Sequence, residues 1–234
     1  MILTILYEDN HLIAVDKPLG LPTQADASGD ADLLTLVKEY IKEKYRKPGA
    51  VYIGMAHRLD RPVGGVVVFA RTSKSASRLS EQLRDGRFRK AYLAVLRGAP
   101  AAPQGELEHW LVKDGAANFV SVVPAGTPGA KRARLAYHTL AARDGLTLVA
   151  VELLTGRSHQ IRVQFAAVGA PVVGDEKYGP KSGAALSALA LHAASVSLEH
   201  PVRRAPLRIS AMPPSGDPWD RFDPNLFPLN ELIS

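Results

Sequence analysis

The segment AHRLDRPVGG, residues 56–65, contains side chains suited to acid–base or nucleophilic chemistry. Asp60 stands between Arg58 and Arg61, directly before an apolar run. Nearby positive charge favours the ionised form of a carboxylate, and an ionised carboxylate beside a strand can act as a nucleophile or a base. A structural ion pair at a turn would use the same residues. These residues alone therefore leave a chemical and a structural role for Asp60 open.

A second candidate segment is TGRSHQIR, residues 155–162. A strand ends at Thr155, a helix begins near Ser158, and the N-terminus of a helix is a natural anion site. Arg157 and Arg162 add positive charge, and Arg162 is placed to point back at a carboxylate or phosphate. The alternative is an ordinary helix cap with two solvated arginines.

Tyr92 is the third candidate, in the middle of the strand predicted at 89–98, where it alternates with Lys90 and Ala94. A tyrosine there can face a ligand. The alternative is a core tyrosine whose hydroxyl is satisfied within the protein.

Several other templates are excluded by residue spacing. HRLD lacks the residue order of a kinase catalytic loop, and the chain has no Walker, GxGxxG or GxSxG motif. The seven histidines show no metal-ligand spacing. Without cysteine there is no thiol nucleophile, disulfide or Cys-based zinc site. We therefore do not expect a metal site.

The overall charge favours an anionic partner. Lys and Arg total 29 against 23 Asp and Glu, a formal net charge of +6, which suits RNA, DNA or a phosphorylated metabolite. A merely basic soluble protein is the alternative. The N-terminus lacks signal-peptide features, and no apolar run reaches the roughly 18 residues that span a membrane. We expect a cytoplasmic monomer that does not bind membranes.

Hydrophobic periodicity and turn residues predict the elements that position these candidates. Helices are predicted at 32–47, 72–86 and 158–169. Leu33, Leu34, Val37, Ile41 and Tyr45 share one face of the first helix. Strands are predicted on either side of a turn at Asp9-Asn10, and at 65–71, 89–98, 106–112, 118–123, 132–143, 146–155, 188–198 and 206–210, with a hairpin at Asp144-Gly145.

Strands in neighbouring runs, with a few helices between them, predict an α+β fold. Its core is a mostly antiparallel mixed sheet with flanking helices. We expect a single catalytic domain at 1–211, followed at 212–234 by a Pro-rich extended surface tail.

Four segments in chain order resemble the RluA family of RNA pseudouridine synthases. They are LYEDNHLIAVDKPLGLPTQ, HRLDRPVGGVVVFARTSKSASRLSEQLRDGRFRKAYLAVLRG, LLTGRSHQIRVQFAAVGAPVVGDEKYG and LALHAASVSLEHP. The resemblance implies the pseudouridine synthase catalytic fold and isomerisation of uridine in tRNA or rRNA by base flipping, without cofactor or metal. It also implies that the chain begins at the catalytic domain, without an N-terminal S4-type RNA-binding module.

The resemblance also assigns roles to residues. Asp60 matches the catalytic aspartate, Arg58 the arginine that enters the RNA stack, and Tyr92 the tyrosine that packs on the flipped uracil. Arg162 matches the arginine that pairs with the catalytic aspartate. We further expect RNA contacts from other residues of these segments, namely His57, Arg61, Arg157 and His159, and from a basic surface comprising Lys74, Arg78, Arg87, Arg89, Lys131 and Arg132.

The chain departs from the family pattern at Pro62–Gly65, where many members have Thr-Ser-Gly or Asp-Ser-Gly, and at Gln164, where His is common. These differences leave the substrate open, and the sequence does not decide whether Asp60 attacks the sugar or removes a sugar proton. Two alternatives to an active synthase remain. One is an RNA-binding protein without catalysis, and the other is a hydrolase or transferase acting on a small phosphorylated molecule.

Overall fold

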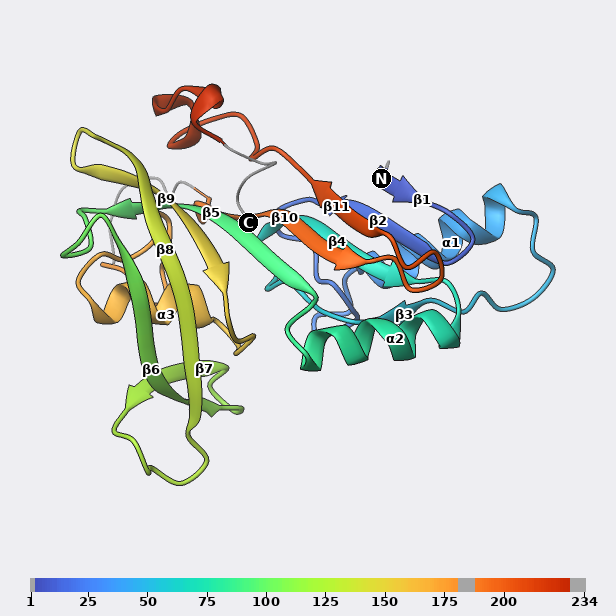
Figure 1. Ribbon diagram of the computed structural model, residues 1–234, viewed down its shortest axis with the longest axis horizontal. Helices are drawn as coiled ribbons and strands as arrows, with labels where there is room; N and C mark the ends of the chain where they lie inside the picture. The colour runs from blue at the N-terminus through green and yellow to red at the C-terminus, as the bar shows by residue number, and fades with distance from the viewer. Residues whose placement is uncertain (1–2, 181–187, 228–234) are drawn as a thin grey trace. The chain divides into compact units, whose positions relative to one another are not determined.

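The computed structural model describes residues 3–180 and 188–227, which form two compact units (Figure 1). The described residues of the first unit are 3–90 and 193–212. Those of the second unit are 91–180, 188–192 and 213–227. Asp60 belongs to the first unit, and Tyr92 and Arg162 belong to the second.

The first unit is built on an antiparallel sheet. Its elements are β1 (Thr4–Glu8), β2 (Leu12–Lys17), α1 (Leu33–Lys44), β3 (Gly54–Met55), β4 (Gly64–Ala70), α2 (Ser73–Arg84), most of β10 (Leu191–Glu199) and β11 (Pro206–Ser210). β2 pairs antiparallel with β1 and β4, β3 pairs with β4, and β11 pairs with β10, which lies beside β4.

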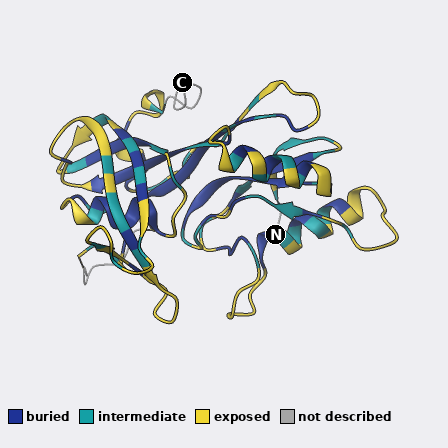
Figure 2. Ribbon diagram, turned by 60° about the horizontal axis from the view of Figure 1, so that its bottom comes forward, coloured by how far each residue is buried: buried dark blue, intermediate teal, exposed yellow. Residues whose placement is uncertain are grey.

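Strand β4 forms the centre of this unit's core. All seven of its residues are buried, as expected for an apolar run covered on both faces. Helix α2 packs against β3 and β4 (Figure 1). Thr72 caps α2 by accepting a hydrogen bond from the Ser75 N–H, and Leu79 of this helix is fully buried. Figure 2 shows buried residues concentrated in the sheet of this unit, and exposed residues in its loops and along its helices.

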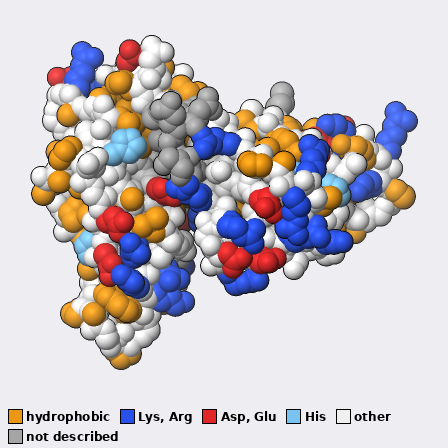
Figure 3. All heavy atoms as spheres, viewed as in Figure 1, with side chains coloured by type: hydrophobic (Ala, Val, Ile, Leu, Met, Phe, Trp, Pro, Cys, Tyr) orange, Lys and Arg blue, Asp and Glu red, His pale blue; other side chains and the backbone are white. Residues whose placement is uncertain are grey.

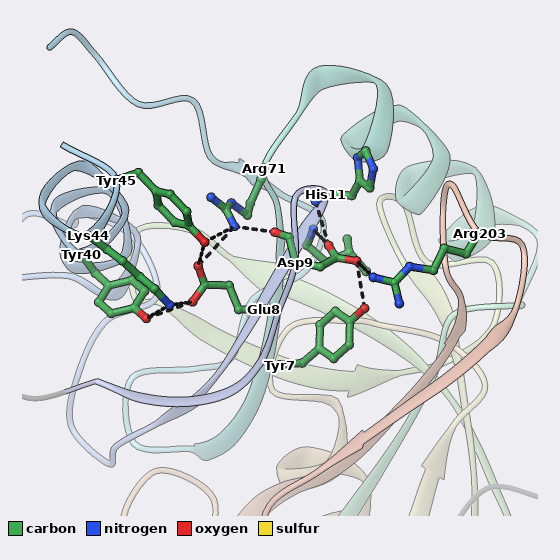
Figure 4. Close-up of polar contacts among 10 residues, drawn as sticks. Tyr7, Glu8, Asp9, His11, Tyr40, Lys44, Tyr45, Arg71 and Arg203 are labelled. Carbon is green, nitrogen blue, oxygen red and sulfur yellow. Dashed lines mark hydrogen bonds and ion pairs between the residues drawn. The ribbon is translucent and has the colours of Figure 1, made fainter. Parts of the chain in front are cut away.

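The turn between β1 and β2 is held by Asp9 (Figure 4). One oxygen of its carboxylate accepts the backbone N–H groups of His11 and Leu12, both at 2.8 Å. The other accepts from His200 Nε2 at 2.8 Å and from Arg203 at 2.8 Å. Burial raises the pKa of Asp9, but the hydrogen bonds from the His11 and Leu12 backbone and from the Tyr7 and His200 side chains outweigh it and lower the pKa to about 2. The turn thus joins β1 to the β10–β11 connection.

Glu8 connects the same strand to helix α1 (Figure 4). Its carboxylate accepts hydrogen bonds from Lys44 at 2.7 Å, Tyr45 at 2.7 Å and Arg71 at 3.2 Å. The sequence predicts that Tyr45 lies within this helix on its apolar face, but α1 ends at Lys44, and Tyr45 caps the helix and is 44% exposed. Its hydroxyl reaches Glu8 while its ring stays at the surface.

The second unit contains a five-stranded arrangement. Its elements are most of β5 (Arg89–Arg97), β6 (Gln104–Asp114), β7 (Phe119–Val123), β8 (Lys131–Arg143), β9 (Leu146–Leu153), α3 (Gln160–Ala167) and 3-10 turns at Trp219–Arg221 and Pro224–Leu226. The order is β5-β9-β8-β6-β7, with antiparallel pairs throughout. The predicted hairpin at Asp144-Gly145 is confirmed, with positive φ at both residues.

Helix α3 packs against β6 and β7. It starts at Gln160 rather than near Ser158, because His159 adopts a left-handed conformation with φ 51° and ψ 17°. Residues 160–165 are all buried. The α+β fold with an antiparallel core and flanking helices is therefore confirmed.

The C-terminal segment differs from the prediction of an extended surface tail. Residues 213–227 form part of the second unit, and Trp219 and Phe222 are buried. The prolines indicated an extended chain, but burying two aromatic side chains stabilises a packed segment. Residues 228–234 of the predicted tail lie outside the described residues. The domain boundary at 211 stays a prediction.

The close approach of β4 to β10 predicts a large cost for Gly65→Ala. Gly65 has φ +113°, and a Cβ there would lie 2.3 Å from the Ala193 carbonyl oxygen. We expect a loss of about 2–5 kcal/mol in the free energy of unfolding, measured in urea. Gly86→Ala is the matched control, since Gly86 has φ +74° with open space around it. It should cost about 1–2 kcal/mol. Equal losses in the two variants would contradict the steric explanation.

Candidate active site

The loop that contains Asp60 lies between β3 and β4 and is fixed on both sides of the aspartate. Leu59 is buried, and the Thr23 hydroxyl donates to its carbonyl at 2.8 Å and accepts its N–H at 3.2 Å. On the other side, the Val63 N–H donates to the Asp60 carbonyl at 3.0 Å and closes a turn. The partly exposed side chain of Asp60 therefore projects from a well-held backbone.

Lys17, which the sequence analysis missed, holds this loop by hydrogen bonds to backbone carbonyls. It is only 1% exposed, and its Nζ donates to the carbonyls of Pro18, Leu21 and Arg61 at 3.1, 2.7 and 3.1 Å. Burial lowers the pKa of Lys17 to about 8, while the negative charge of Asp60 acts to raise it. Lys17 and Asp60 are thus close enough to attract each other. The available signal was a lysine at the inward position after Ile13 and Val15 of an apolar strand.

The two arginines beside Asp60 have different environments. Arg61 donates to the Gly20 carbonyl at 3.0 Å and to the Ser28 hydroxyl at 3.2 Å, and it forms an ion pair with Asp30. Its guanidinium therefore holds the loop of residues 20–30. Arg58 is exposed and makes no hydrogen bond or ion pair to the residues that the structure describes. Of the two, Arg58 is the better placed to contact a ligand.

His57 is directed into the protein. Its Nε2 accepts the Val68 N–H of β4 at 3.0 Å, and its ring lies 5.0 Å from that of Phe88. Burial, with a smaller contribution from the charge of Lys90, lowers the pKa of His57 to about 3, so the ring is neutral. The sequence predicts RNA contact from His57, but this geometry favours a role in holding the loop to β4.

The second unit contributes Tyr92 and Arg162. Tyr92 lies in β5 opposite Val151 of β9 and is 6% exposed. Arg162, in α3, is also 6% exposed and makes a bidentate ion pair with Asp175 at 2.7 and 2.8 Å. Asp175 is a partner that the sequence analysis did not find. The pairing of Arg162 with Asp60, and the assembly of all three residues in one site, stay predictions.

Arg157 and His159 lie in the connection that leads into α3. Arg157 is exposed, and its Nε donates to the Arg132 carbonyl at 3.0 Å. His159 is buried, with its Nδ1 2.6 Å from the Tyr178 hydroxyl. Arg157 is thus accessible to RNA, whereas the geometry of His159 favours a positioning role.

The predicted basic surface is partly neutralised by acidic neighbours. Figure 3 shows Lys and Arg side chains beside Asp and Glu on one face. Arg87 lies 3.0 Å from Asp85, and Arg132 lies 2.7 Å from Glu108. Exposed ion pairs of this kind are weak, so a polyanion such as RNA can displace the acidic side chains and bind the arginines.

Within residues 3–180 and 188–227, no group of three or more His, Asp or Glu residues is placed to hold a metal ion. In the same part of the chain, no helix is long and apolar enough to cross a membrane.

Comparisons with known proteins agree with this architecture. The family model described as RNA pseudouridylate synthase matches residues 11–167. The solved structure of human RNA Pseudouridylate Synthase Domain Containing 4 has a similar fold. Its TM-score is 0.75 at 24% identity, over 90% of this chain and 88% of that chain.

Two bacterial relatives are similar in sequence. The uncharacterized RNA pseudouridine synthase YhcT of Bacillus subtilis is 33% identical over 203 residues, 86% of this chain. Ribosomal large subunit pseudouridine synthase C of Escherichia coli is 32% identical over 218 residues, 88% of this chain. This chain spans 65% of the length of each of these relatives.

The fold and the HRLD loop together define the class, a pseudouridine synthase-type catalytic fold. The chain belongs to the RNA pseudouridylate synthase family, in its RluA branch, a family of isomerases that modify RNA.

The lowered pKa of Lys17 predicts a specific pH dependence of stability. In the unfolded chain Lys17 keeps its proton up to about pH 10.5, but in the folded protein only up to about 8. Between these values unfolding takes up a proton, so stability contributed by this group rises with pH. The free energy of unfolding of wild type, compared with that of Lys17→Met, should therefore increase by up to about 3 kcal/mol as the pH rises from 8 to 10.5.

Urea unfolding of both proteins from pH 7.5 to 10.5 measures this difference. Comparing the two proteins cancels the titration of all other groups. A difference that stays constant across this range would show that Lys17 has an ordinary pKa in the folded protein.

Proposed function

We propose that this protein isomerises specific uridines in structured tRNA or rRNA to pseudouridine. The observation that supports this most strongly is Asp60 itself. It stands in the family's HRLD motif, on a loop held by Thr23 and Lys17. A carboxylate fixed near a buried cation, on a loop at the protein surface, suits chemistry on a substrate that is too large to be enclosed.

The proposed reaction needs no redox step. The N1–C1′ bond of uridine breaks, the uracil turns, and C5 bonds to C1′ and then loses its hydrogen as a proton. Asp60 either attacks the sugar or removes a sugar proton, and both roles need the ionised form. The positive charge of Lys17 lies close enough to attract the Asp60 carboxylate.

The other site residues are proposed to handle the RNA. A base inside folded RNA has to be flipped out, at a cost of a few kcal/mol. Arg58 is exposed and has the planar cationic group that can fill the vacated position in the stack. Tyr92 would pack on the flipped uracil and assist removal of the C5 proton. Arg162 would pair with Asp60, and Arg157 would contact phosphates.

The relative from Escherichia coli is named for the large ribosomal subunit, which supports rRNA as one substrate class. Transfer RNA is the other class that we propose to test. We propose a monomer that acts in the cytoplasm. We also propose that it needs no cofactor, because the isomerisation balances without an oxidant, a reductant or another reactant.

Tritium release from RNA containing 5-³H-uridine tests this proposal. Wild type should release label from unmodified rRNA or tRNA, because C5 loses its hydrogen on becoming the glycosidic carbon. Asp60→Asn should lower the release rate by at least about 10²-fold, with the Kd for RNA within about threefold of wild type. Asp144→Asn, in the β8–β9 hairpin, is the control and should act like wild type.

Full turnover by Asp60→Asn would disprove the assignment of Asp60. Salt-dependent RNA binding by wild type without release from either RNA pool would instead favour an RNA-binding protein without catalysis.

A further inference from the structure

The contact between Arg162 and the segment 175–179 lies outside the roles assigned so far. Arg162 pairs with Asp175 in this segment, and both partners are almost fully buried: the side chain of Arg162 is 8% exposed and that of Asp175 is 0% exposed. The Asp175 carboxylate accepts from Nε at 2.7 Å and from Nη2 at 2.8 Å, so it fixes the plane of the guanidinium. Bidentate pairs of this kind impose direction as well as attraction.

The carboxylate of Asp175 is itself held by the backbone that follows it. Its Oδ1 accepts the N–H groups of Lys177 at 3.0 Å and Tyr178 at 3.1 Å. The Gly179 N–H donates to the Asp175 carbonyl at 2.8 Å, and a Cβ on Gly179 would lie 2.6 Å from that oxygen. The segment is therefore a tight turn, which leaves the carboxylate little freedom to move.

Tyr178 adds a second constraint on the same guanidinium. The Arg162 Cζ lies 5.2 Å from the centre of the Tyr178 ring, a cation–π distance. The Tyr178 hydroxyl accepts the Val120 N–H of β7 at 3.0 Å and lies 2.6 Å from Nδ1 of His159, the residue before α3. The turn thus joins the guanidinium to β7 and to the start of its own helix.

We propose that Asp175 is a positioning residue for the isomerisation, which holds the Arg162 guanidinium in one orientation with Tyr178 packed over it. This inference rests on the proposed function, in which Arg162 acts on Asp60. A buried ion pair alone is a weak source of stability. Orientation explains why one arginine is held by a fully buried carboxylate with an aromatic ring packed over it, and why that carboxylate is itself fixed by two backbone N–H donors.

The test compares Asp175→Asn with Asp114→Asn. Asparagine at 175 keeps an oxygen for the backbone donors but loses the charge and one acceptor for the arginine. Asp114 is the matched control because its Oδ1 likewise accepts two backbone N–H groups, from Ala116 at 2.9 Å and Ala117 at 3.0 Å. It has no arginine partner among the described residues.

We expect Asp175→Asn to lower kcat for tritium release by on the order of 10–100-fold, since small displacements of a catalytic group have effects of this size. KM and the Kd for RNA should stay within about threefold of wild type. Asp114→Asn should match wild type in all three quantities. Wild-type kcat in Asp175→Asn would overturn the proposal.

A double-variant cycle separates positioning from general destabilisation. Arg162→Lys already lacks the guanidinium fork, so adding Asp175→Asn should lower kcat by less than about threefold further. Independent, multiplying losses would show that Asp175 does not act through Arg162. If Asp175→Asn does not fold, Asp175→Glu keeps the charge and moves the carboxylate. It should still lower kcat, and an unchanged kcat would mean that the pair is only structural.

Hydrogen exchange of the Arg162 Nε–H, followed by NMR, gives a readout without RNA. Exchange should be slow in wild type and Asp114→Asn and clearly faster in Asp175→Asn. This separates two kinds of failure. A wild-type protein that is silent on both RNA pools contradicts the proposed function, whereas unchanged exchange in Asp175→Asn contradicts the positioning of Arg162.

Discussion

The carbonyl oxygen of Arg61 is the point on which the candidate active loop depends. It accepts hydrogen bonds from Lys17 Nζ at 3.1 Å and from the Gly20 N–H at 3.0 Å. A lysine that is 1% exposed has lost its hydration, so its ammonium group needs protein acceptors. Three backbone carbonyls meet that need, and the loops at 18–21 and 56–63 are thereby held to the end of β2. Moving the loop next to Asp60 would remove one of the three acceptors of this buried cation.

The second unit uses the same principle with a different cation. Arg162 is buried on α3, and its charge is compensated by Asp175 rather than by carbonyls. In the first unit the buried cation Lys17 lies close to Asp60, and in the second unit the buried cation is Arg162 itself. Asp60 and Arg162 are both proposed to act in catalysis. Uncompensated burial of charge is costly, so each cation can adopt few positions. Preorganised charge of this kind suits a reaction in which ionic groups act on a flipped base.

Much of the fold follows from local patterns. The buried run of β4 was predictable because its β-branched residues favour strands. The turn at Asp144-Gly145 was predictable because both residues tolerate positive φ. The burial of Trp219 and Phe222 was not, because five prolines in the segment indicated an extended chain. Whether an aromatic side chain near the end of a chain finds a surface to pack against depends on distant residues.

The sequence by itself determined the family and singled out Asp60, because motif spacing and residue type are properties of neighbours along the chain. Only the tertiary structure decided where the surrounding charges point. Arg61 turns to Gly20 and Asp30, 41 and 31 positions away, and His57 turns inward to β4. Lys17 reaches a carbonyl 44 positions away, and Arg162 takes Asp175 as partner. The partner of a long side chain depends on which groups lie near it in the folded protein and on the cost of burying an unpaired charge. Neither can be read from the spacing of residues along the sequence.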